Sequence, residues 1–145
     1  MNKPVLKFKL LSPEAKLPQY AHPEDACFDL YSTEHVVLKS LERHVFMTGI
    51  TADIPKNWYV SICDKSGLAA KQGLHVLGGV VDAEYTGEWG VILINLGSED
   101  YTVEVGDKIA QAQLVPAPRV ELVEVESLDL NVLRGEGGFG STGKK

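Results

Sequence analysis

Short extended segments, each ended by glycine, proline, asparagine or aspartate, recur along the whole chain and constrain its fold more than any other feature. In the first, at residues 5–10, three apolar side chains alternate with two lysines, which is the pattern of a half-buried strand. Comparable segments follow at residues 35–38, 43–48, 58–63, 90–96, 101–105, 108–115 and 120–125. This spacing predicts an all-β sandwich or barrel.

Two segments depart from the strand pattern. Residues 66–71, SGLAAK, predict one short helix, with Ser66 able to cap its start and Gly73 ending it. Residues 134–145, RGEGGFGSTGKK, are too rich in glycine to pack by themselves, so we expect a flexible tail. The predicted division is a β-rich domain over residues 1–133 and a tail over residues 134–145.

Composition narrows the class of protein. A chain of 145 residues that is 44% hydrophobic fits one globular domain, and its formal net charge of -6 argues against a general nucleic-acid-binding surface. No apolar run is long enough to cross a bilayer. With two cysteines, Cys27 and Cys63, and no recognisable secretory leader, we expect free thiols in a cytoplasmic protein.

Residues 78–88, GGVVDAEYTGE, have the composition of a tight hairpin that offers backbone to a ligand. Gly78 and Gly87 permit turns and close approach, and Tyr85 offers a ring face. Asp82, a carboxylate that is ionised at neutral pH, is the candidate general base that takes a proton from water. The residues alone leave open the alternative of an ordinary surface hairpin.

The tail is the second candidate. Backbone amides at its glycines, the guanidinium of Arg134 and the hydroxyls of Ser141 and Thr142 would form a flexible phosphate clasp, and Phe139 would stack on a flat ring. It is not a Walker A loop, because no GKS or GKT closes it and no helix follows. A disordered tail remains the alternative.

Three further stretches carry polar candidates. The predicted helix start at Ser66, with Lys65 beside it, suits an anion, although an ordinary capped helix has the same pattern. Asp29 could hold a hard cation directly or through water, and Gln111 could orient a water or a phosphate oxygen. The four histidines lack the spacing of metal ligands.

Five stretches in order resemble the homotrimeric deoxyuridine triphosphate nucleotidohydrolases, the dUTPases. They are LPQYAHPEDACFDLY, DKSGLAAKQG, GGVVDAEYTGE, GDKIAQ and RGEGGFGSTG, and together they span nearly the whole chain. The resemblance implies a jelly-roll-like subunit in a trimer with shared active sites. It implies Mg2+-assisted hydrolysis of dUTP to dUMP and pyrophosphate, which keeps uracil out of DNA and supplies dUMP for thymidylate synthesis. The net charge and the short apolar runs predict no direct nucleic-acid binding and no membrane association.

The resemblance also implies roles for individual residues. Asp82 would deprotonate the attacking water, Asp29 would hold magnesium through its water shell, and Tyr85 would pack on the deoxyribose. The main chain near Gly78 would read the uracil edge. The implied substrate-binding set is Lys65, Ser66, Gly67, Gly78, Val81, Tyr85, Gln111, Arg134, Phe139, Gly140, Ser141 and Thr142.

Three residues depart from the family pattern. Lys65 and Lys108 stand where arginine is usual, and a lysine cannot give arginine's planar two-pronged phosphate contact. Cys27 stands where glycine is frequent. Two alternatives remain: a dCTP deaminase-like enzyme of the same fold, and a regulatory protein that uses the nucleotide as a switch for binding another protein.

Overall fold

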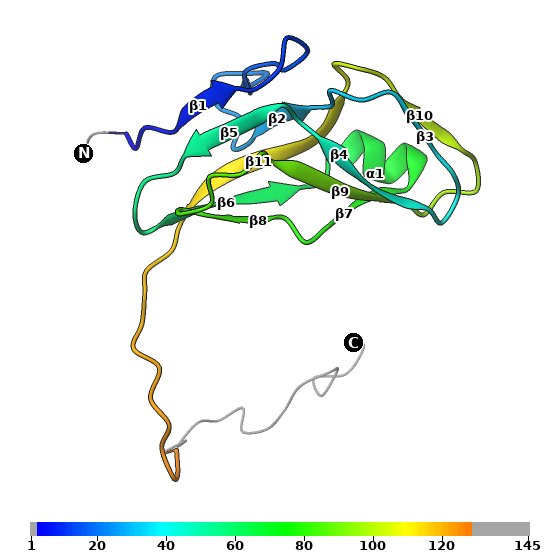
Figure 1. Cartoon of the computed structure of the whole chain (residues 1–145). Coiled ribbons are helices and arrows are strands. Elements are labelled where there is room, and N and C mark those ends of the chain that lie inside the picture. Colours follow the sequence, from blue (N-terminus) through cyan, green and yellow to red (C-terminus); the bar gives the residue numbers. More distant parts are fainter. Residues whose placement is uncertain (1–2, 129–145) are drawn as a thin grey trace.

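A computed structural model of the chain describes residues 3–128 and confirms the all-β prediction (Figure 1). The strands form a four-stranded sheet β2–β11–β6–β8, a three-stranded sheet β4–β9–β7 and two pairs, β1–β5 and β3–β10, all antiparallel. Their bounds are β1 Lys7–Leu10, β2 Phe28–Tyr31, β3 Val36–Leu38, β4 Arg43–Met47, β5 Ile50–Asp53, β6 Trp58–Cys63, β7 Leu74–Leu77, β8 Val80–Asp82, β9 Gly90–Asn95, β10 Tyr101–Val103 and β11 Lys108–Pro116.

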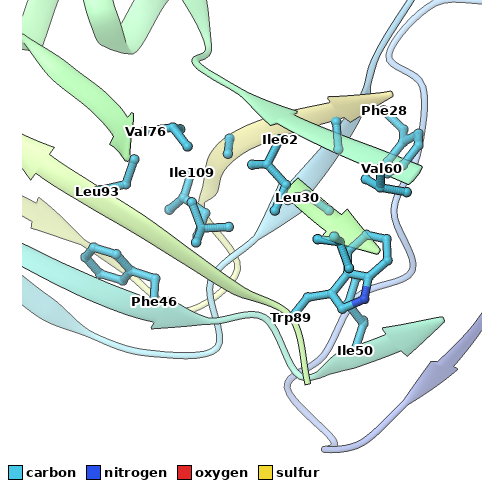
Figure 2. Close-up of a cluster of buried hydrophobic side chains, with 14 of the residues drawn as sticks. Phe28, Leu30, Phe46, Ile50, Val60, Ile62, Val76, Trp89, Leu93 and Ile109 are labelled. Carbon is cyan, nitrogen blue, oxygen red and sulfur yellow. The ribbon is translucent and has the colours of Figure 1, made fainter. Parts of the chain in front are cut away.

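The core lies between the sheets, and strand alternation builds it (Figure 2). Along β9, Val91 and Leu93 are buried, whereas Ile92 and Ile94 on the other face are only partly buried. Trp89, which precedes this strand, is 1% exposed and meets Phe8 of β1 edge to face. Alternating side chains therefore give each sheet one face toward a shared interior.

Seven of the eight predicted strand segments coincide with observed strands. The prediction for residues 120–125 is wrong, because residues 117–128 form no strand and leave the body after β11 (Figure 1). These residues have strand-like composition but no neighbouring strand within the described chain to pair with. Four observed strands lie outside the predicted segments, namely β2, β5, β7 and β8, whose short sequences FDLY, ITAD, LHVL and VVD carry little periodic signal.

The single helix in the described residues, α1 (Ser66–Gln72), ends as predicted. Gly73 caps it with a left-handed φ of 72°, a conformation that favours glycine. Its start differs from the prediction: Lys65 is the N-cap residue and no side chain caps the helix, so the capping role expected of Ser66 is wrong. The exposed start of α1 therefore has backbone N–H groups without a side-chain acceptor.

No helix within residues 3–128 is long and apolar enough to span a membrane. Both thiols, Cys27 and Cys63, are free, as predicted. Among the described non-glycine residues, only Leu41 and Asn57 have positive φ. Cys27 therefore occupies a backbone conformation that does not require the glycine frequent at this position.

Candidate active site

Antiparallel register brings three of the candidate stretches together at one end of the four-stranded sheet. Asp29 of β2 lies opposite Gln111 of β11, and Gln111 lies opposite Cys63 of β6. Cys63 is the last residue of β6, so Lys65 and Ser66 follow within one short connection. Residues separated by more than 80 positions in the sequence thus form one polar cluster.

The carboxylate of Asp29 is the buried centre of this cluster. Its side chain is 5% exposed, with Lys65 Nζ 2.5 Å from Oδ1 and Lys108 Nζ 2.6 Å from Oδ2. Each carboxylate oxygen of Asp29 therefore faces an ammonium group at close range. Burial alone would raise the pKa of Asp29, but the two ammonium groups outweigh it and hold that pKa below its ordinary value.

Two lysines against one carboxylate leave a local excess of positive charge. Asp29 in turn raises the pKa of Lys108, so this lysine stays charged. The cluster therefore provides what a chain of net charge -6 needs in order to bind a polyanion, namely a local concentration of cations. Ser66 and Gly67 are exposed beside it at the start of α1.

Gln111 is oriented by the backbone next to Lys65. Its Nε2 donates a hydrogen bond of 2.9 Å to the carbonyl oxygen of Asp64. The amide group is thereby fixed with Oε1 turned away from that carbonyl, because two acceptors repel each other. Gln111 can offer this oxygen to a water molecule and its second N–H to a phosphate oxygen.

Residues 78–88, the hairpin of the sequence prediction, form a second cluster on β8. They contain only this one strand, which pairs with β6, so the structure has no pair of strands within the predicted hairpin. Gly78 and Gly79 have φ of 74° and 105°, and a Cβ on Gly79 would lie 2.6 Å from the Ile62 carbonyl oxygen. This close approach lets Gly79 accept a 2.7 Å hydrogen bond from Ile62 N and fixes the hairpin against β6. Asp82 ends β8 with its side chain exposed, whereas the side chain of Val81 is buried.

Tyr85 stands at the mouth of the hairpin and is 48% exposed. Its backbone N–H donates to the Asp82 carbonyl, and its hydroxyl donates to the Glu88 carbonyl, both at 3.1 Å. A Cβ at Gly87 would lie 2.4 Å from the Tyr85 hydroxyl, so glycine is what leaves room for the ring. The residues around the resulting cavity, of about 220 Å3, are Val80, Val81, Asp82, Tyr85, Trp89 and Gly90.

The two clusters do not meet within one chain. Asp82 lies opposite Tyr59, four residues along β6 from Cys63, and β8 and β2 are opposite edges of the sheet. Four residues span about 13 Å and three strand spacings about 14 Å, which places Asp82 and Asp29 about 20 Å apart. A base must come within about 3 Å of the proton it takes, so these residues cannot serve one small substrate inside a single chain.

The predicted tail residues Arg134, Phe139, Gly140, Ser141 and Thr142 lie outside the described residues. Within residues 3–128, no three histidine, cysteine or acidic side chains form a group that could hold a metal ion. A dedicated cage of protein ligands is therefore not part of the described site.

Comparison with known proteins shows which family the chain belongs to. The family model described as dUTPase matches residues 13–143. The chain belongs to the dUTPase family. Deoxyuridine 5'-triphosphate nucleotidohydrolases from Clostridium tetani and Nautilia profundicola are 47% and 44% identical to it; they cover 99% and 96% of this chain, and the matches cover 100% and 99% of those proteins. The resemblance in five stretches is confirmed.

Solved structures extend the similarity to three dimensions. The dUTPase of Staphylococcus bacteriophage 80alpha with dUpNHpp gives a TM-score of 0.90 at 31% identity, covering 96% of this chain and 98% of that one. A D95N mutant of the dUTPase from phage phi11 of S. aureus, described with a structural Mg(II) ion, gives a TM-score of 0.81 at 28% identity; the match covers 86% of this chain and 99% of the phage chain. The all-β fold is thus the dUTPase fold, and the dCTP deaminase alternative is not supported.

One residue of the cluster, Asp64, carries no sequence signal of its role. Both carboxylate oxygens of Asp64 and its carbonyl oxygen make polar contacts. An acidic residue before a lysine is nevertheless not a recognisable sequence motif. In the sequence, Lys108 is recognisable only as a departure from the family pattern. Its contact with Asp29 follows from the β2–β11 register, which a single sequence does not reveal.

Proposed function

We propose that the chain hydrolyses dUTP to dUMP and pyrophosphate. The main observation behind this proposal is the family match over residues 13–143. The relatives are named deoxyuridine 5'-triphosphate nucleotidohydrolases, which is the same activity. The geometry agrees with it, because one cluster holds a carboxylate and an aromatic ring beside a cavity, and the other presents cations suited to phosphates.

In this reaction a water molecule attacks the α-phosphorus in line with the bond to the bridging oxygen of the β-phosphate. Asp82 takes the proton of that water, the new P–O bond forms, and pyrophosphate leaves with the electrons of the broken bond. Tyr85 packs on the deoxyribose and leaves no room for a 2′-hydroxyl, while backbone groups at Gly78 and Val81 read the uracil edge. The hairpin therefore provides both the base and the selection of the nucleoside.

The phosphate half consists of Lys65, Ser66, Gly67 and Gln111. Lys65 offers a flexible cation, and the hydroxyl of Ser66 offers a hydrogen bond. Gly67 has no side chain, so phosphate can approach the backbone there. In such a reaction the protein forms few covalent bonds itself. Its main contribution to catalysis is therefore to stabilise the negative charge on the phosphate oxygens. Lys65 must exchange its contact with Asp29 for one with phosphate when the substrate binds.

Magnesium fits this site as an ion shared with the substrate. Mg2+ usually keeps several waters and is bound through one or two carboxylates plus substrate phosphates. Asp29 supplies one buried carboxylate, and its Oδ1 is released when Lys65 exchanges this contact for phosphate. It would hold the ion through water, and the ion when bound would neutralise phosphate charge.

Assembly as a homotrimer would join the two halves. Since Asp82 and Asp29 are about 20 Å apart by strand geometry, a complete site requires the hairpin of one chain beside the cluster of another. Exposed apolar side chains after β11 support such assembly, because isolated proteins seldom leave so many in one segment. They are Val120, Leu122, Val123, Val125 and Leu128, which are 54–90% exposed.

The predicted tail is the last part of the proposed active site. Residues 134–145, beyond the domain of residues 1–133, would close over the bound triphosphate, with Phe139 covering the uracil and Arg134, Ser141 and Thr142 holding the γ-phosphate beside Gly140. Ordering such a segment costs on the order of 1 kcal/mol per residue, so closure should require the full triphosphate. We place the enzyme in the cytoplasm, where nucleotide pools are handled.

The experiment is a substrate panel. Purified protein is incubated with Mg2+ and, separately, dUTP, UTP, dTTP and dCTP, and the products are identified. We expect pyrophosphate and dUMP from dUTP, with little turnover of the others. Equal hydrolysis of all four nucleotides would contradict the proposed selection, and ammonia from dCTP would contradict the reaction itself.

A second candidate function is nucleotide-dependent regulation of another protein. The structurally similar phage 80alpha dUTPase is described as controlling transfer of virulence genes by a G protein-like mechanism, and it covers 96% of this chain. A partner whose binding differs between the dUpNHpp-bound and the nucleotide-free protein would support this role. It can coexist with hydrolysis.

A further inference from the structure

Asp64, in the connection between β6 and α1, is held at three separate atoms. Its Oδ1 accepts a 2.5 Å hydrogen bond from the backbone N–H of Val76, and Oδ2 lies 2.8 Å from Nδ1 of His75. Its carbonyl oxygen accepts the Gln111 side-chain amide at 2.9 Å. One residue therefore ties the connection to β7 on one side and to β11 on the other.

These contacts supply support that neighbouring elements lack. β7 is an edge strand of the three-stranded sheet, and the Asp64 carboxylate takes up a backbone N–H at that edge. The N-cap Lys65 makes no side-chain capping bond, so no side chain fixes the first turn of α1. Asp64, one residue earlier, instead ties the chain that enters the helix to β7 and to Gln111.

The next two residues of the chain are Lys65 and Ser66 of the phosphate half. We infer that Asp64 is a positioning residue for substrate phosphates, which fixes Lys65, Ser66 and the Gln111 amide in one arrangement before the nucleotide binds. This inference rests on the proposed function. It assigns no contact between Asp64 and the nucleotide.

Two substitutions of Asp64 can separate the effect of its contacts from the effect of its charge. A second negative charge near a triphosphate is unfavourable, so the carboxylate would be a poor choice if its charge mattered rather than its contacts. Asparagine keeps an oxygen for the Val76 N–H, and its amide can donate to Nδ1 of neutral His75. Alanine removes both contacts. Asp64→Asn should therefore preserve phosphate binding, whereas Asp64→Ala should weaken it.

The test uses calorimetry in the presence of Mg2+ to measure the affinity for dUpNHpp and for dUMP. Four proteins are compared: the wild type, Asp64→Ala, Asp64→Asn and Asp53→Ala. Asp53 is a matched control, because its carboxylate is 70% exposed and contacts only Lys7 among the described residues. For Asp64→Ala we expect about a tenfold weaker affinity for dUpNHpp, which corresponds to about 1.4 kcal/mol, but a smaller change for dUMP. Asp64→Asn and Asp53→Ala should stay within about threefold of wild type.

Two outcomes would overturn the inference: wild-type affinity for dUpNHpp in Asp64→Ala, or equal losses for dUMP and dUpNHpp, which would show general damage to the fold. If Asp64→Ala fails to fold, Asp64→Asn still decides, since a loss as large as tenfold in this folded variant would show that charge rather than position is required. Failure of the wild-type protein itself to bind dUpNHpp would instead contradict the proposed function.

Discussion

Lys65 Nζ lies 2.5 Å from Asp29 Oδ1, so the lysine offered to phosphate is already paired with a buried carboxylate. Lys65 comes from the connection after β6 and Asp29 from β2, and the intervening strand β11 adds Lys108 on the other carboxylate oxygen. The nucleotide must therefore compete with Asp29 for Lys65. A site that exchanges ion pairs in this way needs a long cationic side chain that can move from one anion to another, which Lys65 provides.

The first prediction concerns Lys65 itself. Lys65→Met should weaken kcat/KM for dUTP by about a hundredfold, because one charged contact to phosphate contributes about 3 kcal/mol. Lys65→Arg should leave activity unchanged or raise it, since arginine can contact phosphate with two parallel N–H groups. Steady-state kinetics on both variants is the measurement, with Lys71→Met on the exposed side of α1 as the control. A large loss in Lys65→Arg would show that the lysine has a role of its own.

The second prediction is a pH dependence of stability at Asp29. Its pKa is lower in the folded protein than the ordinary value of about 3.9, so its contribution is complete above about pH 5 and is lost as pH falls through the folded pKa. Asp29→Asn should be less stable than wild type by about 2 kcal/mol at pH 7. Denaturant unfolding from pH 7 to pH 3 should show this difference shrinking at the acid end. A difference that grows with acidity would contradict the pairing.

The third prediction uses the space at Gly87. A Cβ there meets only the far end of the exposed Tyr85 side chain, so Gly87→Ala should fold normally while displacing the ring. Discrimination against UTP should fall by about tenfold, as one imperfect steric contact is worth about 1–2 kcal/mol. The measurement is the ratio of kcat/KM for dUTP and UTP. Tyr85→Phe, which keeps the ring and loses only the bond to Glu88, should retain most of the discrimination.

The periodic segments predicted most of this fold because each carries its own signal. Alternation in β9 and the glycine after α1 are local features, and they appear in the structure where the sequence placed them. The strand predicted at residues 120–125 failed for the opposite reason: strand composition without a partner strand does not make a sheet.

The candidate site was predictable in its parts but not in its arrangement. Motifs identified Asp29, Lys65 and Gln111, yet only the β2–β11–β6 register shows that they adjoin, with Asp64 fixing the connection. The same register separates them from Asp82, which no reading of one sequence can show. Long-range pairing, rather than local propensity, carries this information.

The fourth prediction tests the base. Asp82→Asn keeps the shape of the hairpin but cannot take a proton, so turnover of dUTP should fall by about a thousandfold or more. Affinity for dUpNHpp should change little, because the side chain is not among the residues proposed to bind phosphate. Calorimetry and single-turnover kinetics on the same preparation separate the two effects. Near-normal turnover would exclude Asp82 as the base.

The fifth prediction follows from the separation of Asp82 and Asp29 in one chain. If each active site combines the hairpin of one chain with the cluster of another, two inactive variants can complement each other. Asp82→Asn retains a normal cluster, and Lys65→Met retains a normal hairpin. Random mixing of equal amounts by joint refolding should leave about a quarter of the sites with both normal halves, which restores about a quarter of wild-type turnover.

The matched control is a mixture of Asp82→Asn with a double variant that carries both Asp82→Asn and Lys65→Met. It contains no normal hairpin, so its turnover should stay at the level of Asp82→Asn alone. Complementation in the first mixture and not in the second would identify sites built between chains. If neither mixture regains activity although ion-exchange chromatography, which separates the variants by charge, shows mixed assemblies, each chain must bring Asp82 to its own cluster. The β8–β6–β11–β2 order, which keeps these residues at opposite edges of one sheet, would then have to rearrange on substrate binding.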